Sequence, residues 1–236
     1  MKPVKFKDLI LFEDNDYVLI NKPPFISTLE DRHEPINILA LARDYTEDAQ
    51  VCHRLDKDTS GVLAIAKNPE AYRHLSMQFE HRGVKKIYHA VADGIHNFEN
   101  RIVSARILKQ NDGTVRLSSK GKDAETSFLT LEVFLKHTLV ECRPVTGRMH
   151  QIRVHLSSIG APICGDSVYG GKPFLVSELK RNFRVKKDTE EEPLMKRMAL
   201  HAFSLEFVGL AGMPVSVEAP YPKDFAAVLK QLRNSI

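Results

Sequence analysis

Residues 53–61 read HRLDKDTSG and lead directly into VLAIA at 62–66. This short continuous apolar run after a glycine is typical of a strand that is buried on both faces. Asp56 therefore precedes a buried strand, with Arg54 two residues before it, and such a carboxylate could act as a nucleophile or base. Asp56 or Asp58 could instead cap a turn through its own backbone, as Asp often does before Thr, Ser and Gly. Taken alone, the residues favour the turn.

Around this stretch the chain predicts more strands than helices, without a regular alternation of the two. Expected strands lie at 16–21, 86–92, 126–134, 138–142, 198–207 and 215–218, and the turn at 111–113 predicts a hairpin between 105–108 and 114–117. Expected helices lie at 36–43, 69–82, 147–159 and 223–232. We therefore predict an α+β class with a mainly antiparallel mixed β-sheet core and flanking helices. The whole chain, residues 1–236, is expected to be a single domain, with 170–196 as a surface loop or insertion.

The composition indicates a globular protein: of 236 residues, 43% are hydrophobic and 27% are charged. A net charge of +4 permits a polyanionic partner without requiring one. The first residues lack the apolar core of a secretory signal, and no apolar run approaches the roughly 20 residues that span a bilayer. We therefore expect a cytoplasmic protein without a membrane partner. The three cysteines are far apart and favour neither a disulfide framework nor a zinc ribbon.

Two further segments carry more polar groups than packing requires. Tyr88 is flanked by alanines on its strand face, where it could stack on a base, donate a proton or fill the core, and taken alone the core is favoured. Residues 146–155 read TGRMHQIRVH at the start of a predicted helix, where His150 and Arg153 would share one flank. This density of polar groups suits an anionic ligand. A zinc site formed by His150 and His155 is disfavoured, because their spacing places them apart around a helix.

Together, these segments resemble a known family. HRLDxxTSG at 53–61, KxY at 86–88, GRxHQIRxH at 147–155 and GxPxxGDxxYG at 160–170 are similar to the motifs of the RluA-type pseudouridine synthases. Leu200-His201-Ala202 also matches a strand motif of that family, so the resemblance runs from about residue 11 to residue 207. The order of these specific motifs reverses the preference for a simple turn at Asp56.

The resemblance implies roles for individual residues. Asp56 matches the catalytic aspartate, Arg54 the arginine that displaces the target base, Tyr88 the tyrosine packed against the uracil, and Arg153 the arginine that pairs with the catalytic carboxylate. We therefore expect Asp56, Tyr88 and Arg153 to be catalytic. The same motifs supply the candidate substrate-binding residues Arg54, His53, Arg148, His150 and Gln151.

The implied activity is isomerisation of specific uridines in rRNA or tRNA, on a pseudouridine-synthase-like catalytic domain with a central active-site cleft. The uridine would be flipped out of its helix or loop before reaction. Asp56 could attack C1′, attack C6 or remove the C2′ proton, and the sequence does not choose among these routes. We expect no cofactor and no metal, RNA as the partner, and a monomer.

Two other function classes stay open. A non-catalytic RNA-binding protein could retain the fold, although it would not need a carboxylate facing a polyanion. A nucleoside glycosidase would need a second carboxylate, for which only Asp58 or Asp166 is available. The chain also departs from the family at 24–28, where a glycine and then a histidine are common. The few residues before Leu11 predict a short member without the N-terminal RNA-binding domain.

Overall fold

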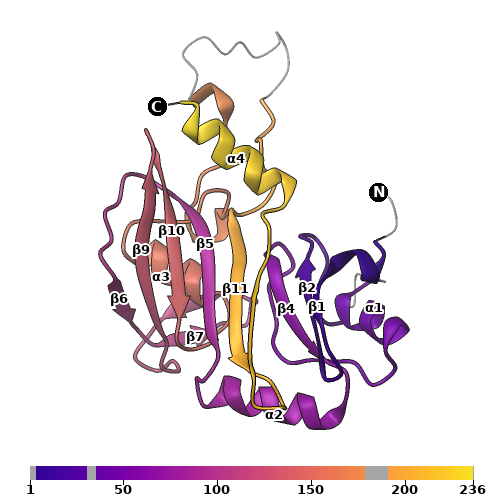
Figure 1. The fold of residues 1–236 in the computed structure, drawn as a ribbon. Helices are drawn as coiled ribbons and strands as arrows, with labels where there is room; N and C mark the ends of the chain where they lie inside the picture. Colours follow the sequence, from indigo (N-terminus) through magenta and orange to yellow (C-terminus); the bar gives the residue numbers. More distant parts are fainter. Residues whose placement is uncertain (1–3, 31–35, 179–190, 236) are drawn as a thin grey trace. The chain divides into compact units, whose positions relative to one another are not determined.

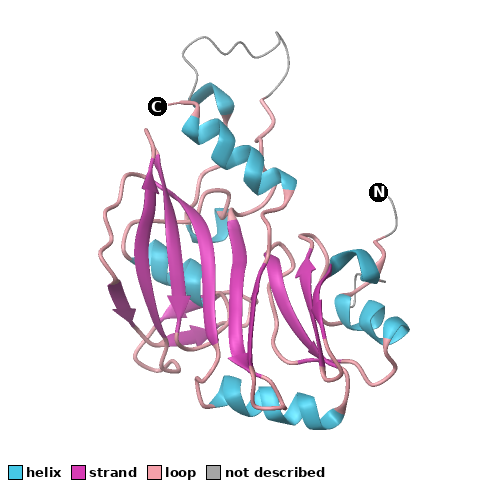
Figure 2. Ribbon diagram, viewed as in Figure 1, coloured by secondary structure: helices cyan, strands magenta, loops and turns pink. Residues whose placement is uncertain are grey.

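The computed structural model describes residues 4–30, 36–178 and 191–235. The chain divides into two units, the first formed by residues 1–88 and 201–220 and the second by 89–200 and 221–236. Figure 2 shows that each unit combines strands with helices, and most strand pairs are antiparallel, with a parallel pair between β4 (Ser60–Ala66) and β11 (Leu200–Val208). The predicted α+β class with a mainly antiparallel mixed sheet is confirmed.

The first unit is built on the strand order β1-β2-β4-β11. Its elements are η1 (Phe6–Leu9), β1 (Ile10–Glu13), β2 (Tyr17–Lys22), α1 (Ile38–Tyr45), β3 (Gln50–Val51), β4, α2 (Pro69–Glu80), β11 and β12 (Pro214–Glu218). Strand β3 pairs with β4, and β12 pairs with β11. Strand β5 (Lys85–Asp93) begins in this unit and ends in the second. Figure 1 shows β4 beside β2, as their antiparallel register requires.

Side chains of β2 and β4 alternate between two apolar clusters on opposite faces of the sheet. The α2 face buries Tyr17, Leu19, Val62 and Ala64 together with Ala71 and Leu75 of the helix. The α1 face buries Val18, Ile20, Leu63 and Ile65 together with Ile38 and Ala42. Because helices cover both faces, these strands are apolar at consecutive positions, as the run at 62–66 predicts.

The start of helix α2 is determined by the two residues Asn68 and Pro69. The Asn68 side chain accepts a hydrogen bond from the Ala71 N–H at 2.8 Å, and Pro69 occupies the first helical position. Asn is among the preferred residues before a helix, and proline is tolerated at its first position because that N–H needs no partner. The predicted start of this helix is therefore confirmed.

The second unit contains the strand order β10-β9-β6 and a separate two-stranded sheet, β7-β8. Its elements are β6 (Arg101–Ser104), β7 (Ile107–Lys109), β8 (Val115–Leu117), β9 (Glu125–Val133), β10 (His137–Pro144), α3 (Gln151–Ser158), η2 (Ser167–Tyr169), η3 (Val176–Glu178) and α4 (Lys223–Arg233). Strands β7 and β8 are the hairpin predicted around residues 111–113. Helix α3 contacts β8, β9 and β10 and buries Ile152, Val154 and Leu156.

The predicted loop at 170–196 contains η3, and its residues 179–190 lie outside the described residues. The prediction of one domain for the whole chain stays a prediction. Among the described residues, no helix has the length and apolar character needed to cross a membrane.

Candidate active site

Asp56 opens a turn between β3 and β4. The Thr59 N–H donates to the Asp56 carbonyl at 3.0 Å, which closes the turn through residues 57 and 58. The Asp56 side chain is half-buried and Arg54 is exposed, whereas Leu55 between them is buried. Burial of Leu55 fixes this short segment to the protein while its neighbours reach the surface.

The end of the HRLDKDTSG motif is fixed by β11. The Ser60 hydroxyl is hydrogen-bonded to Nδ1 of His201 at 2.9 Å, and His201 Nε2 is 3.1 Å from the Ala219 carbonyl. Gly61 has φ +116°, and a side chain there would overlap the backbone of Ala202. Only glycine meets both requirements. The Ser-Gly pair of the motif is therefore needed to start β4 against β11, directly after the Asp56 turn.

Two residues that the sequence did not single out hold the other side of this loop. The Thr28 hydroxyl donates to the Leu55 carbonyl at 2.8 Å and lies 3.2 Å from the Leu55 N–H. The Lys22 side chain is completely buried, and its ammonium donates to the carbonyls of Pro23, Ile26 and Lys57 at 2.9–3.0 Å. The signal in the sequence was a lysine that ends an apolar strand, because a buried ammonium requires several acceptors.

Tyr88 lies within electrostatic range of Asp56. Its ring packs against the apolar cluster that contains Leu55 and Ala202. Burial raises the pKa of the Tyr88 phenol, and the negative charge of Asp56 raises it further. The phenol is therefore protonated at neutral pH and can donate a proton or hydrogen bond, but it cannot serve as a base.

His53, a predicted substrate-binding residue, has a partner inside the protein. Its Nε2 accepts a hydrogen bond from the Ala64 N–H at 3.1 Å, and its ring lies 4.8 Å from that of Phe79. Burial lowers the pKa of His53 to about 3, with a further contribution from the charge of Lys86. The neutral ring therefore supports β4 at this position, and a role in binding substrate stays a prediction.

The second polar segment begins differently from its prediction. The helix was expected from residue 147, but α3 begins at Gln151, and His150 precedes it in the left-handed conformation with φ 52°. Nδ1 of His150 lies 2.9 Å from the hydroxyl of Tyr169. His150 therefore lies before the helix and not on it, although His150 and Arg153 both contact the Tyr169 ring. Arg148 is exposed in the turn before the helix, and its Nε donates to the Asp123 carbonyl at 3.1 Å.

Gln151 is fully engaged inside the second unit. Its Oε1 accepts from the Thr146 hydroxyl at 2.7 Å and from the Arg148 N–H at 2.9 Å. Its Nε2 donates to the Glu125 carbonyl at 2.8 Å and to the Thr126 hydroxyl at 3.0 Å. A glutamine amide offers two donors and two acceptor positions, and all four are used here. This geometry gives Gln151 a scaffolding position, and the predicted contact with substrate has no support from it.

Arg153 forms a buried ion pair with Asp166. Its Nε and Nη2 donate to the two carboxylate oxygens at 2.7 and 2.8 Å, and its guanidinium carbon lies 4.9 Å from the centre of the Tyr169 ring. Asp166 is only 2% exposed. A carboxylate held in this way is poorly suited to be the second catalytic acid of a glycosidase. Arg153 belongs to the second unit and Asp56 to the first, so the predicted pair between them stays a prediction.

A family described as RNA pseudouridylate synthase matches residues 16–158, a range that contains Asp56, Tyr88 and Arg153. The ribosomal large subunit pseudouridine synthase C of Vibrio vulnificus (strain CMCP6) is 33% identical over 239 residues, covering 99% of this chain and 72% of the relative. The protein of the same name from Escherichia coli (strain K12) is 34% identical over 242 residues, covering 99% and 73%.

Solved structures agree with the sequence relatives. Human RNA pseudouridylate synthase domain containing 4 superposes with a TM-score of 0.76 at 26% identity, covering 97% of this chain and 94% of the human chain. Human RNA pseudouridylate synthase domain containing 1 gives a TM-score of 0.72 at 27% identity, covering 97% and 90%. The chain belongs to the RNA pseudouridylate synthase family and is an isomerase that converts uridine in RNA to pseudouridine.

Proposed function

We propose that this chain modifies uridine in large-subunit ribosomal RNA, with Asp56 as the catalytic carboxylate. The observation that carries the assignment of the residue is the Asp56 turn. It is held from both sides, by Thr28 and by the Ser60–His201 contact, while Asp56 itself stays half-buried within range of Tyr88. The choice of RNA is supported by two bacterial relatives, 33 and 34% identical, that are named ribosomal large subunit pseudouridine synthases.

The reaction conserves atoms and electrons. The N1–C1′ bond of uridine breaks, the uracil turns, and C5 bonds to C1′, after which the C5 proton is lost and N1 gains a proton. An ionised Asp56 would start this sequence by attacking C1′ or C6, or by removing the C2′ proton. Because the phenol of Tyr88 is protonated, it supplies a ring face for the uracil or a proton, and it leaves the basic role to the carboxylate.

Arg54 is suited to replace the flipped nucleotide. It is exposed two residues before Asp56, and the buried Leu55 between them fixes its backbone. Extruding a base costs a few kcal/mol, and a guanidinium that fills the vacated position would offset part of that cost.

A basic pocket in the second unit is the proposed contact with the RNA backbone. The pocket has a volume of about 370 Å³ and lies between the β7–β8 hairpin and the turn before α3. Its lining includes four cationic side chains, Lys109, Lys120, Lys122 and Arg148. If each neutralises one phosphate, the affinity should fall with a log–log salt slope of about 3, since single strands contribute about 0.7 per phosphate. Among the other basic clusters of the sequence, those around Lys180 and Lys186 lie outside the described residues, whereas Lys196 and Arg197 are paired with Glu192 and Asp224.

The deciding experiment is tritium release from 5-tritiated uridine in large-subunit ribosomal RNA, with transfer RNA as the parallel substrate. We expect the wild-type protein to release tritium from ribosomal RNA and Asp56→Asn to release none. Release from transfer RNA alone would overturn the proposed substrate. RNA binding without release would favour the non-catalytic alternative, and free uracil would favour the glycosidase. Mapping pseudouridines in total RNA with and without the gene then identifies the position.

A further inference from the structure

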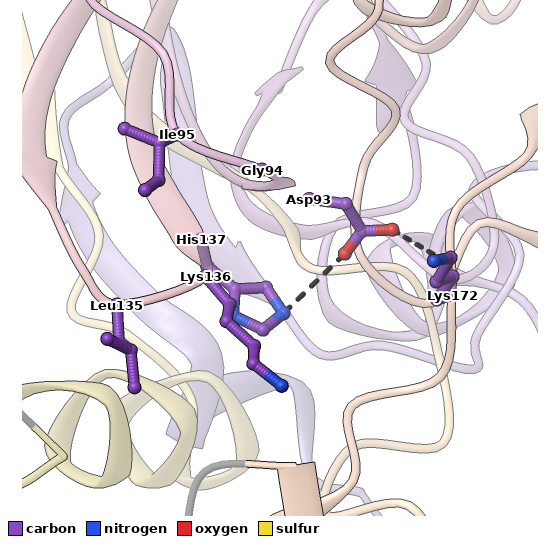
Figure 3. Close-up of a pocket in the computed structure, with 7 residues that line it drawn as sticks. All are labelled: Asp93, Gly94, Ile95, Leu135, Lys136, His137 and Lys172. Atoms are coloured by element: carbon purple, nitrogen blue, oxygen red, sulfur yellow. Dashed lines mark hydrogen bonds and ion pairs between the residues drawn. The ribbon is translucent and has the colours of Figure 1, made fainter.

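A cluster of three metal-ligating side chains lies in the second unit and takes no part in the proposed reaction. The ligand atoms of Asp93, His137 and Cys164 all lie within 4.8 Å of one another. His137 and Cys164 are buried, 6% and 2% exposed, and Asp93 is half-buried. Figure 3 shows the carboxylate of Asp93 and the ring of His137 directed toward each other, and Nε2 of His137 is 3.6 Å from Asp93 Oδ1.

Backbone hydrogen bonds fix the segments that carry these residues. The Cys164 N–H donates to the Val91 carbonyl at 2.8 Å, and the Asp93 N–H donates to the Pro162 carbonyl at 2.9 Å. The Gly94 N–H donates to the Lys136 carbonyl at 2.9 Å, next to His137. The end of β5, the start of β10 and the loop after α3 are thus held together by their backbones. Their side chains converge on rigid supports, as a metal site requires.

A hydrogen bond from a residue outside the three-ligand cluster already orients the carboxylate of Asp93. Its Oδ2 accepts a hydrogen bond from the Lys172 N–H at 2.7 Å, which leaves Oδ1 on the side of His137 (Figure 3). Outer partners of this kind set the direction of a metal-binding group. The Cys164 sulfur lies 3.5 Å from the Lys172 carbonyl, so the same residue borders two members of the cluster.

The donor set matches zinc. Thiolate, imidazole and carboxylate are the three groups that bind this ion in proteins, at about 2.0–2.3 Å. The cluster therefore has to contract modestly around one ion. A zinc ion with one thiolate, one carboxylate and a neutral imidazole carries no net charge, so its burial avoids the cost of an isolated charge. Binding replaces the proton of the Cys164 thiol, which is released to solvent.

A pocket gives the ion a path of entry. It has a volume of about 620 Å³ and is lined by Asp93, His137, Gly94, Ile95, Leu135, Lys136 and Lys172. The two lysines oppose a cation electrostatically, and they would attract a hydroxide or another anion to the fourth position of a bound ion. We propose that Asp93, His137 and Cys164 form a zinc site that links β5, β10 and the loop after α3.

The test is a titration of the purified, metal-stripped full chain with Co²⁺ as a spectroscopic substitute for zinc. Wild type should develop the near-ultraviolet charge-transfer band of a thiolate–cobalt bond, and added Zn²⁺ should displace it. Cys164→Ser should lose this band. Cys52→Ser is the matched control, because Cys52 is half-buried in the first unit, and it should keep the band. No band in wild type, or a band that survives in Cys164→Ser, overturns the site.

Two further variants test the remaining ligands. His137→Gln and Asp93→Asn should each weaken Co²⁺ binding by at least about 100-fold. Removing a residue that only hydrogen-bonds to a metal ligand costs up to about 100-fold, and loss of the ligand itself should cost at least as much. Zinc should raise the melting temperature of wild type and of Cys52→Ser but not of these variants. Equal affinity in wild type and both variants would contradict the assignment. These measurements contain no RNA, so they stand apart from the proposed function.

A second inference concerns Phe25, beside the Asp56 loop. Phe25 is 38% exposed and has φ 66°, a backbone conformation that favours glycine. Its N–H donates to the Lys57 carbonyl at 2.9 Å, next to Asp56. An exposed aromatic ring on a strained backbone therefore lies beside the Asp56 loop.

We infer that the Phe25 ring stacks on an RNA base next to the target uridine. This inference depends on the proposed function, because it assigns part of the substrate contact of the same site. Stacking of a base on an aromatic ring contributes about 1–3 kcal/mol, which is about 5- to 150-fold in affinity, and it tolerates any base.

Phe25→Gly distinguishes a role of the ring in RNA binding from a role in stabilising the fold. Relief of strain should raise the melting temperature, while the loss of the ring should raise the KM for RNA about 5- to 150-fold with kcat unchanged. Phe25→Tyr should keep the wild-type KM. An unchanged KM in Phe25→Gly overturns the contact. Wild-type tritium release, measured alongside, shows whether the proposed function itself has failed.

Discussion

Residues 53–61 and residues 146–155 are both rich in polar side chains, yet the structure uses them in opposite ways. In the first segment Arg54 is exposed and Asp56 is half-buried, and side chains from elsewhere hold the backbone. In the second segment Gln151, Arg153 and His155 are buried and bonded to partners within their own unit. The first segment leaves Arg54 and Asp56 accessible, whereas the second bonds Gln151, Arg153 and His155 to internal partners.

A high density of polar residues therefore does not by itself locate a site. Helix α3 buries its first six residues, 151–156, so the polar side chains among them must find internal partners. A turn that precedes a buried strand can be fixed through its backbone and one apolar residue, here Leu55. The question that separates the two cases is where the backbone hydrogen bonds of each segment go.

The largest effect should come from Asp56→Asn. The amide has nearly the same shape but can act neither as a nucleophile nor as a base, so tritium release from 5-tritiated uridine should be abolished. RNA binding should persist, because the change removes a negative charge near phosphates. Asp58→Asn is the matched control and should turn over within a few-fold of wild type. Substantial tritium release by Asp56→Asn would mean that Asp56 is not the catalytic carboxylate, and that residues 53–61 do not form the active site.

Tyr88→Phe should have the next largest effect. The ring that packs beside Leu55 is retained, so the fold and RNA binding should change little. If the protonated hydroxyl supplies a proton in the reaction, kcat should fall about 10²–10⁴-fold. Single-turnover rates at saturating RNA measure this directly. Wild-type rates would restrict Tyr88 to stacking or packing.

Much of the fold follows from local patterns. The apolar runs at 17–20 and 62–66 predict strands covered on both faces, and Asn68 with Pro69 predicts the start of α2. The start of α3 does not follow, because His150 adopts a left-handed conformation and contacts Tyr169, 19 residues further along the chain. Local propensity contains no information about such a partner.

The motifs name candidate site residues, but they do not reveal the contacts that those residues make. The HRLDKDTSG stretch points to Asp56, and Gly61 is explained only by the close approach of β11. Lys22 and Thr28 were missed because their hydrogen bonds are to backbone carbonyls and an N–H, which leave no pattern in the sequence. Gln151 was expected to bind substrate, because nothing local shows that Thr126 and Glu125 satisfy its amide.

Gln151→Leu tests whether the buried hydrogen bonds of Gln151 stabilise the fold. The substitution leaves several buried donors and acceptors around Thr146 and Thr126 without their partner, and each such group costs about 1–3 kcal/mol. We expect the free energy of unfolding to fall by about 3 kcal/mol in urea denaturation. The exposed Arg148→Ala should change it by less than about 1 kcal/mol. Equal stability of the two variants would mean that Gln151 is not structural.

The smallest effect concerns a histidine in each segment. Burial lowers the pKa of His53 to about 3 and also lowers the pKa of His155. Each histidine therefore binds fewer protons in the folded than in the unfolded chain, so stability is lost as the pH falls below the unfolded pKa of about 6.5. Between pH 6.5 and 5.5, His53 should contribute a loss of about 1 kcal/mol.

Comparing the pH dependence of His53→Gln and His155→Gln with that of wild type isolates these two contributions. Both variants should be less stable than wild type at pH 7, because the Ala64 N–H loses its acceptor and the Thr126 hydroxyl loses one of its two partners. The informative quantity is the slope of the unfolding free energy between pH 7 and 5.5, above the range where most carboxylates titrate. Each variant should flatten this slope. If only His155→Gln does so, then His53 is protonated in the folded chain and is not the neutral acceptor for Ala64, and its predicted role in binding substrate regains support.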